Sequence, residues 1–592
     1  MDRFKKIISF FVPILFLLIV SVYLLEDNVS DISDEQEQET KQEAIQKAPA
    51  ETLDEQHLHD NPLIYANDDD TSVVTMYLTV SRGNKAENTD HSWDEINTYS
   101  VYDYDQMGVE RYQIAGLLQV GDENGPTAGQ VGYGETVPNA TVQIRGQTSS
   151  RNPQKNYKIE LKEGAGSWRG QRTISLNKHQ TDNLRFRNKL ANDLLEEIDE
   201  LMALRTQFVH LYVCDKTGSN PEQFVDYGLY TQIEQLNKTA MRSHGLDKTG
   251  YLYKINYFEF YRYEDVIKSE TDPSFDRAAM NELLETKGET SNEKLIEMLE
   301  AVNDSSIPVD QVLDTYFDRE NLCYWMAFEI LIGNIDTQSR NVYLYSPLNG
   351  NKWYLIPWDH DASFMEEEWK MTDFVDADSW ETGVSNYWGN VLFQRCLKSE
   401  SFRKQLDDAI EDLRSRLSEE KLKEMVERYA QVVKPYAFSM PDIKYIGVTE
   451  KEYDRLASGL PELVEHYYEK YKDSLEKPMP FYVGQPGREG NSLVMTWDPS
   501  FDFDAEDITY HVVLARDYLY EDVVFETTTR LPQAECKMPK AGQYFLKVTA
   551  TNTSGETQDC FDYYVIDQGK VYGTYCFYIN EAGQTEVWNN EE

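Results

Sequence analysis

The sequence predicts a mixed α+β protein with an all-β C-terminal domain, preceded by one membrane-spanning helix. Strand-like runs separated by glycine turns fill residues 73–161, and helix-periodic patterns fill 399–435 and 450–475. Beyond residue 478 the pattern changes to short strands with turns between them, which is typical of an all-β domain. At 592 residues the chain is long enough for two or more domains.

The N-terminal segment predicts a membrane anchor. Residues 7–25 form an uncharged apolar run, with basic residues before it and acidic residues after it, so we expect the N-terminus inside and the rest of the chain outside. No small-x-small cleavage site follows, so we favour an uncleaved single-pass anchor in the cell membrane within residues 1–26 over a cleaved secretion signal, which stays the alternative. Residues 27–71 are rich in Glu, Gln and Asp, which predicts a disordered stalk.

Composition narrows the class of partner. The formal net charge of −47 argues against nucleic acid, because phosphate backbones are bound by basic surface. A polyanion such as ATP could enter only with a divalent cation and local Lys or Arg side chains. The six cysteines form no C-x-x-C pair, which fits neither a zinc site nor a disulfide framework. A disulfide between Cys560 and either Cys536 or Cys576 stays open.

The stretch from residue 333 to 364 carries the chemistry. A helix-like run over 309–332, too polar for a second membrane span, leads into a loop that holds Asp336, and Asn341 follows with four residues between them. Two strand-like runs, 342–345 and 353–356, then flank an Asn-Gly turn and predict a hairpin. Directly after the hairpin come two further carboxylates, those of Asp359 and Asp361.

Carboxylates gathered in this way need a counter-charge. Three of them about 5 Å apart repel by roughly 3 kcal/mol per pair, and their oxygens suit Mg²⁺, Mn²⁺ or Ca²⁺. An Asp, an Asn five positions on and an Asp after a hairpin is also the layout of phosphoryl-transfer sites in protein kinases. No His-Arg precedes Asp336 and no Asp-Phe-Gly occurs at Asp359, so an ordinary eukaryotic-type kinase is excluded.

A second polar turn lies upstream, between the strand-like runs 140–145 and 156–161. Its backbone N–H groups, with a basic residue on the returning strand, suit phosphates. Lys155 is in phase with the core-facing residues of that strand, and Lys158 is in the opposite phase. A surface hairpin with solvated lysines is the alternative. The residues that we assign to phosphate binding here are Arg145, Gly146, Ser149, Ser150, Lys155 and, as the fallback, Lys158.

Further elements follow in order. Residues 181–204 have helical periodicity, with Thr181 and Asp182 as cap candidates. Two more strands are expected at 208–213 and 227–233, and the second ends at Glu234. We interpret the scattered histidines, His179, His210 and His360, as structural.

Six spaced motifs occur in one order along the chain: R-G-Q-T-S-S (145–150), P-x-K-N-Y-K-I (153–159), L-R-F-R-N-K-L-A (184–191), G-L-Y-x-x-x-E (228–234), G-N-x-D-x-x-x-x-N (333–341) and P-W-D-x-D (357–361). This series resembles the spore coat protein H (CotH) kinase family over roughly residues 75–475. Several spaced motifs in order are far more specific than any one of them.

The resemblance implies a divergent, two-lobed protein-kinase-like domain over residues 72–478. It implies an enzyme that uses ATP and Mg²⁺ or Mn²⁺ to phosphorylate Ser or Thr of a protein, here a surface or spore-coat protein. By position, Asp336 is similar to the catalytic aspartate, Asn341 and Asp359 to metal ligands, and Asp361 to a further ligand or support. Lys155 is similar to the phosphate-contacting lysine and Glu234 to the hinge position between lobes.

Residues 479–568 resemble a fibronectin type III sandwich, with Trp497 early and a Y-x-x-x-V-x-A-x-N-x-x-G strand from Tyr544 to Gly555 late, followed by a tail over 569–592. Two alternatives to an active kinase stay open. One is a surface scaffold or pseudokinase, because free ATP is scarce outside cells. The other is a metal-assisted hydrolase built on the carboxylates, which would leave Lys155 unused. An acidic enzyme favours a basic, Ser/Lys/Arg-rich protein substrate.

Overall fold

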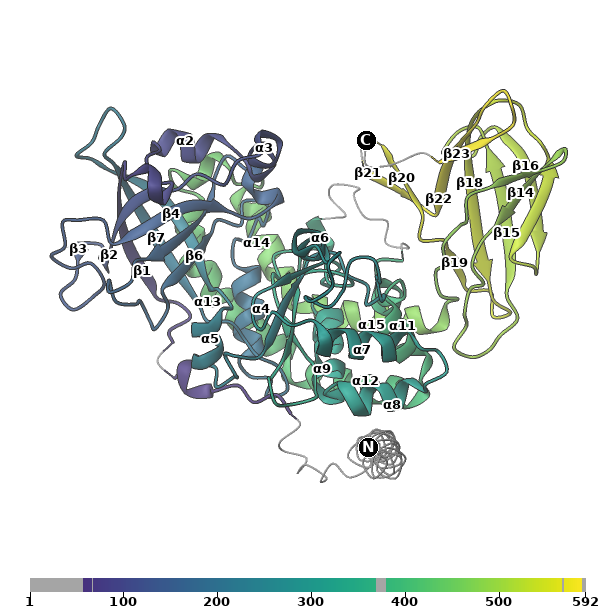
Figure 1. Cartoon of the computed structure of the whole chain (residues 1–592), viewed down its shortest axis with the longest axis horizontal. Coiled ribbons are helices and arrows are strands. Elements are labelled where there is room, and N and C mark those ends of the chain that lie inside the picture. The colour runs from purple at the N-terminus through teal and green to yellow at the C-terminus, as the bar shows by residue number, and fades with distance from the viewer. Residues whose placement is uncertain (1–56, 67, 369–379, 567–568, 588–592) are drawn as a thin grey trace, which may run out of the picture. The chain divides into compact units, whose positions relative to one another are not determined.

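A computed structural model gives the fold of most of the chain (Figure 1). It describes residues 57–66, 68–368, 380–566 and 569–587. The membrane anchor predicted over residues 7–25 lies outside these, and in the described part no helix is long and apolar enough to cross a bilayer. The described residues form a large sheet, a helical region and a C-terminal β region, which confirms the coarse α+β prediction.

The large sheet has eight strands: β1 (Val73–Ser81), β2 (Ile114–Asp122), β3 (Gly125–Pro126), β4 (Ala140–Arg145), β5 (Asn156–Leu161), β6 (Thr173–Asn177), β7 (Thr206–Asp215) and β8 (Phe224–Glu234). Their order is β1-β7-β8-β6-β5-β4-β2-β3. β1 runs parallel to β7 and also pairs with β2, so the sheet closes on itself. The short helices α2 (Trp93–Thr98) and α3 (Val101–Met107) lie between β1 and β2 in the chain.

The two faces of this sheet differ: one packs into the core, and the other does not. Along β4 the side chains alternate between buried and half-buried, and the buried ones join the core of the sheet. Arg145 is paired with Asn156 across β4 and β5, and Gln143 with Lys158. Because side chains alternate along a strand, Arg145 and Lys158 lie on the face opposite to that core.

The helix predicted over residues 181–204 is wrong in its bounds. The observed helix is α4 (Arg187–Leu195). The Asp182 carboxylate accepts hydrogen bonds from the backbone N–H groups of Leu184 (2.8 Å) and Arg187 (3.0 Å) and pairs with the Arg187 guanidinium. Asp182 therefore stabilises a turn before α4 and holds the first residue of that helix, Arg187, but is not itself helical.

The helical region contains a four-stranded sheet in the order β10-β9-β11-β12. Its strands are β9 (Tyr251–Ile255), β10 (Leu284–Thr286), β11 (Val342–Ser346) and β12 (Tyr354–Pro357). Its helices are α5 (Lys238–Ser243), α6 (Arg277–Leu283), α7 (Glu293–Asn303), α8 (Val309–Tyr316), α9 (Arg319–Leu331), α11 (Val391–Lys398), α12 (Glu400–Arg416), α13 (Glu419–Ala437), α14 (Glu450–Gly459) and α15 (Leu463–Glu476).

The run predicted as one helix over 309–332 is two helices, α8 and α9. The break comes at Asp318, whose side chain accepts hydrogen bonds from the N–H groups of Glu320 (3.2 Å) and Asn321 (3.4 Å) and so begins α9. α9 is buried along most of its length and forms the centre of the helical core. It leads the chain directly into the loop that carries Asp336.

The C-terminal β region has two sheets around a core that contains Trp497, and a separate two-stranded sheet, β20-β21. One sheet has the order β13-β14-β17, and the other has the order β16-β15-β18-β22-β23, with β19 beside β18. Residues 569–587, which we set apart as a tail, contribute β21 to β23. The strand bounds are β13 (Gly487–Glu489), β14 (Ser492–Thr496), β15 (Thr509–Ala515), β16 (Val523–Thr529), β17 (Gln533–Lys537), β18 (Gly542–Thr551), β19 (Thr557–Asp559), β20 (Tyr563–Ile566), β21 (Gly569–Tyr572), β22 (Thr574–Ile579) and β23 (Thr585–Val587).

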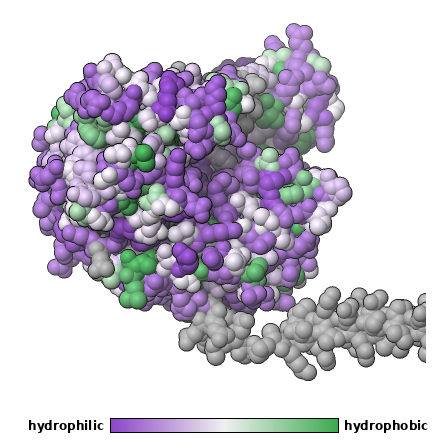
Figure 2. All heavy atoms as spheres, turned by 60° about the vertical axis from the view of Figure 1, so that its left-hand side comes forward, coloured by the Kyte–Doolittle hydropathy of each residue, from purple (hydrophilic) through white to green (hydrophobic). Residues whose placement is uncertain are grey.

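Two further features of the molecule are the state of its cysteines and the character of its surface. All six cysteines are free thiols, so neither of the disulfides left open by the sequence is formed. The face of the molecule shown in Figure 2 is hydrophilic over most of its area, and its hydrophobic residues form small separate patches. That surface agrees with the formal net charge of −47.

Candidate active site

The loop after α9 is held in place where it begins. Gly333 has φ +62°, and a Cβ at this position would lie 2.1 Å from the ring of Tyr467, so only glycine fits here. The next residue, Asn334, donates from Nδ2 to Glu329 Oε2 at 2.8 Å. The other oxygen of Glu329 lies 3.2 Å from His360 Nε2. One buried carboxylate therefore ties the loop of Asp336 to the loop of Asp359 and Asp361.

Asp336 and Asn341 are in direct contact. Asn341 Nδ2 donates to Asp336 Oδ2 at 2.8 Å, and the other oxygen of Asp336 pairs with the Arg340 guanidinium. Burial raises the pKa of Asp336, Arg340 opposes this, and the charge of Asp361 adds to it. Asp336 and Asn341 therefore lie side by side, as the sequence predicts, and Arg340 also contacts Asp336.

Asp359 is the most perturbed carboxylate of the site. Burial, and then the charge of Asp361, raise its pKa to about 6. The one hydrogen bond to its side chain within the described chain comes from Asn188 Nδ2, at a long 3.3 Å. His179 Nδ1 lies 3.9 Å from Asp361 Oδ2. Both Asp359 and Asn341 have left-handed backbones, with φ +63° and +57°.

Two cations, one from each of two different sheets, lower the pKa of Asp359. Arg145 stands at the end of β4 in the large sheet, and Lys254 lies on β9 of the four-stranded sheet; both lower the pKa of Asp359. Arg145 donates to the side chain of Asn177. Lys254 lies 5.9 Å from the Trp358 ring centroid and has neither a hydrogen bond nor a salt bridge within the part of the chain that the structure describes. Burial lowers the pKa of both cations.

The structure does not bring the predicted lysines to these carboxylates. Lys155 Nζ donates to the backbone carbonyl of Ser150 at 2.6 Å, and Asp103 is the carboxylate that acts on it. Lys158 Nζ lies 2.8 Å from Glu160, a neighbour on its own strand. Lys155 thus supports the turn between β4 and β5, and Lys158 forms a partly exposed ion pair.

The turn itself is tightly built. Gly146 has φ +87°, and a Cβ there would lie 2.1 Å from Ser149 Oγ. Ser149 Oγ accepts from Asn156 Nδ2 at 3.1 Å. Ser150 is fully buried, donating to the carbonyl of Gln147 and accepting from the N–H of Val101. Ser150 therefore holds the turn together, whereas Gly146 and Ser149 lie beside Arg145.

Glu234 lies in a closed ion network away from the other site residues. It pairs with Arg205, and its Oε2 lies 2.9 Å from His244 Nε2. These partners outweigh burial and lower the pKa of Glu234 to about 2. Such a carboxylate is saturated by protein partners.

Sequence reasoning missed Lys254 and Arg340, and it assigned His179 to structure alone. Arg340 carried a local signal, because it stands four residues after Asp336. Lys254 carried a weaker one, as a single charge inside the buried strand Tyr251–Ile255. His179 gave none, because its nearness to Asp361 depends on the tertiary fold.

The oxygen ligands fit a hard divalent cation. Asn341 uses its amide nitrogen on Asp336, which leaves the amide oxygen as the ligating atom, and Asp359 has one weak hydrogen bond. Among the described residues, no three His, Cys, Asp or Glu side chains gather as a metal site on their own. The donor set therefore suits Mg²⁺ or Mn²⁺, which take few protein ligands and complete their shell with phosphate and water.

Residues 142–472, more than half of the chain, match the CotH kinase protein family. The chain therefore belongs to this family of atypical protein kinases, which confirms the family and the enzyme class expected from the sequence. A relative is the inner spore coat protein H of Bacillus subtilis (strain 168), 22% identical over 316 residues, which cover 52% of this chain and 80% of that protein. The twitchin kinase region from C. elegans matches over 68% of this chain and 70% of its own, at 12% identity and a TM-score of 0.17, too low to support an argument about the fold.

Proposed function

We propose that this protein is a membrane-anchored atypical kinase that transfers the γ-phosphate of ATP to Ser or Thr of a surface or spore-coat protein, with a divalent metal. One observation carries the proposal: Glu329 ties the Asp336 loop to the Asp359 loop, and there Arg145 from the large sheet and Lys254 from the four-stranded sheet both lower the pKa of Asp359. Cations for a polyphosphate and oxygen ligands for a metal are thereby gathered at one place. Such a combination is what phosphoryl transfer requires.

Each residue has a role in this proposal. Asp336 accepts or orients the proton of the attacking hydroxyl. Asn341 and Asp359 hold the metal, supported by Asp361, and the bound ion neutralises phosphate charge. Arg145, Lys254 and the Gly146–Ser149 part of the turn hold phosphates, and Lys155 supports that turn through Ser150. Arg340 pairs with Asp336 and opposes the rise in its pKa that burial causes.

The same proposal extends to domain organisation. The large sheet and the helical region, over 72–478, would form the two lobes of a kinase-like domain. The C-terminal region would be a fibronectin III-like module, supported by its two antiparallel sheets packed around Trp497. Residues 1–26 would anchor the chain in the membrane, and 27–71 would form the stalk. The net charge of −47 favours a basic, Ser/Lys/Arg-rich substrate.

A non-catalytic surface scaffold is the second candidate. It is favoured by the contacts of Asp336, since both of its oxygens already have partners, Arg340 and Asn341. A carboxylate-based hydrolase explains less, because it gives no task to Arg145 and Lys254.

The test is phosphate transfer from γ-labelled ATP by the full chain with Mn²⁺, measured as autophosphorylation. Asp336→Ala is expected to lower transfer at least about 1000-fold, because it removes the proton acceptor, and to leave the melting temperature unchanged. Unchanged transfer would refute the assignment. A thermal shift with Mn²⁺ and ATP in the absence of any transfer would favour the scaffold.

A further inference from the structure

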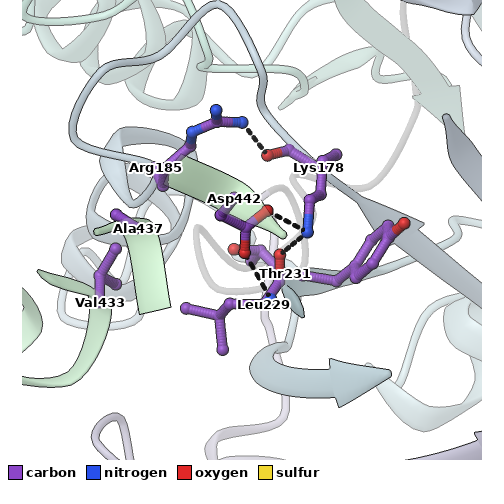
Figure 3. Close-up of a pocket in the computed structure, with 8 residues that line it drawn as sticks. Lys178, Arg185, Leu229, Thr231, Val433, Ala437 and Asp442 are labelled. Carbon is purple, nitrogen blue, oxygen red and sulfur yellow. Dashed lines mark hydrogen bonds and ion pairs between the residues drawn. The ribbon is translucent and has the colours of Figure 1, made fainter. Parts of the chain in front are cut away.

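An ion pair between the helical region and the large sheet is buried near the site (Figure 3). Lys178, directly after β6, has its Nζ 2.7 Å from Oδ1 of Asp442, which lies between α13 and α14. Their side chains are 1% and 6% exposed. The space that they border measures about 10 Å³, which admits nothing larger than a water molecule. This feature is therefore a contact and not a ligand site.

The contact is specified in detail. Lys178 Nζ also donates to the carbonyl oxygens of Tyr227 (2.7 Å) and Leu229 (2.9 Å). Asp442 accepts from the N–H of Leu229 at 3.0 Å, and from Gln154 Nε2 at 2.7 Å. A Cβ at Gly228, where φ is +76°, would lie 2.1 Å from Asp442 Oδ2. Every atom of the pair is thus placed by β8 and the turn before β5.

A buried ion pair of this kind is costly and adds little stability over apolar residues of the same volume. We therefore interpret the ion pair by the positions in which it holds the residues around Lys178. Lys178 is held by its backbone as well: its N–H donates to Asn156 Oδ1 at 2.7 Å, and its carbonyl accepts from Arg185 at 2.9 Å. Arg185 in turn donates to the carbonyl of Tyr445 at 3.2 Å, three residues after Asp442.

The residue next to Lys178 is His179. Its backbone is left-handed, with φ +46°, and its side chain is 4% exposed. Its Nδ1 lies 3.9 Å from Asp361 Oδ2. Its Nε2 is buried without a hydrogen-bond partner in the described part of the chain. A strained backbone and an unpaired buried nitrogen are costs that persist only where the surroundings enforce them.

We propose that Asp442 is a positioning residue for phosphoryl transfer: it fixes Lys178, and through Lys178 it holds His179 close to Asp361. The imidazole then limits the orientation of the Asp361 carboxylate, which supports the metal site two residues after Asp359. This inference rests on the proposed function and adds to it Asp442, a residue of the segment between α13 and α14. Groups that orient a ligand in this way are as necessary as the ligand's own contacts.

The test uses the full chain and the variant Asp442→Asn, which keeps the shape of the side chain and removes its charge. We expect kcat for autophosphorylation to fall about tenfold, with KM for ATP changing less. In the His179→Ala background, Asp442→Asn is expected to cause no further loss, because the residue through which it acts is gone. Losses that multiply, or an unchanged kcat in Asp442→Asn, would overturn the proposal.

Controls separate positioning from folding. Asp454→Asn breaks an exposed 2.7 Å pair with Lys434 that also joins α13 to α14, and it should leave kcat unchanged. Lys178→Met tests the same contact from the other side if Asp442→Asn melts early. The affinity for Mn²⁺ in the presence of ATP, measured in the same variants, repeats the cycle without turnover. If the wild-type chain transfers no phosphate, the proposed function is refuted. The Mn²⁺ affinities of the same variants then still test whether Asp442 acts through His179.

Discussion

Two buried charged clusters in this molecule look alike in composition and differ in chemistry. Around Glu234, each charge has a close partner: Arg205 and His244 bind the carboxylate, and Asp60 lies 2.7 Å from the other nitrogen of His244. Burial opposes ionisation there, but these partners lower the pKa of Glu234 to about 2 and raise that of His244 to about 9. The Glu234 cluster is electrostatically complete.

Around Asp359 the charges are only partly matched. Among the described residues its carboxylate has one hydrogen bond, at 3.3 Å, and Arg145 and Lys254 lower its pKa without a hydrogen bond or salt bridge to it. Its pKa is therefore raised to about 6. The comparison teaches that a buried carboxylate serves the fold when protein groups satisfy it, and is available to a ligand when they do not.

The largest effect is expected for Asp359→Asn. Phosphate transfer should fall about 1000-fold, because a metal ligand is lost. Without ligands the variant should be more stable than the wild type at pH 7.5, by about 3 kcal/mol. The sign follows from the raised pKa: between pH 4 and 6 the unfolded carboxyl ionises before the folded one, so the wild type loses stability as pH rises. Urea unfolding at pH 7.5 measures the difference in stability between the two chains. A variant that is less stable than the wild type and still transfers phosphate would contradict both expectations.

Glu234→Gln should show the opposite pattern. Removing one partner of a buried ion pair leaves Arg205 and His244 uncompensated, so the free energy of unfolding should fall by about 3 kcal/mol. Phosphate transfer per folded molecule, assayed well below the melting temperature, should stay the same. A kinetic defect at unchanged stability would instead support the hinge role that the family resemblance implied for Glu234.

The pH dependence of stability sharpens the contrast. The folded pKa of His244, about 9, lies above the ordinary value of 6.5, so its contribution is full below pH 6.5 and is lost as pH rises through 9. Unfolding measured at pH 6.5 and 9.5 should show a loss of about 2 kcal/mol in the wild type that is absent in His244→Gln. Equal losses in both chains would show that the Glu234 cluster is not closed as described.

The smallest effect concerns ATP affinity. Lys254→Met should raise KM for ATP about tenfold, because a cation near the phosphates is lost. Lys158→Met is the matched control: it removes an equal charge from a partly exposed pair with Glu160 and should change KM less than twofold. If the two variants behave alike, Lys254 is not at the phosphates.

Local spacing was enough to predict the hairpin and the carboxylates beside it. Strands expected at 342–345 and 353–356 occur at Val342–Ser346 and Tyr354–Pro357. Helices occur over the runs predicted at 399–435 and 450–475, but each run is two helices: α13 begins anew after Ser418, and residues 460–462 separate α14 from α15. Asp336 and Asn341 meet as expected, since only four residues lie between them.

What the sequence did not give depends on tertiary contacts. Lys254 reaches Asp359 because β9 pairs with β11, which places residues 254 and 343 side by side. Lys155 and Lys158 were judged by strand phase, which gives the face of a side chain but not its partner. The helix bounds near 181 and 318 were wrong because an aspartate side chain in each case binds backbone N–H groups and begins or delays a helix.

The most direct measurement is diffraction from crystals of the chain with ATP and Mn²⁺, recorded at the manganese absorption edge. The account predicts an anomalous peak within about 2.5 Å of both the Asp359 carboxylate and the Asn341 amide oxygen, with the phosphates toward Arg145 and Lys254. Manganese and nucleotide bound elsewhere, with Asp359 untouched, would contradict it.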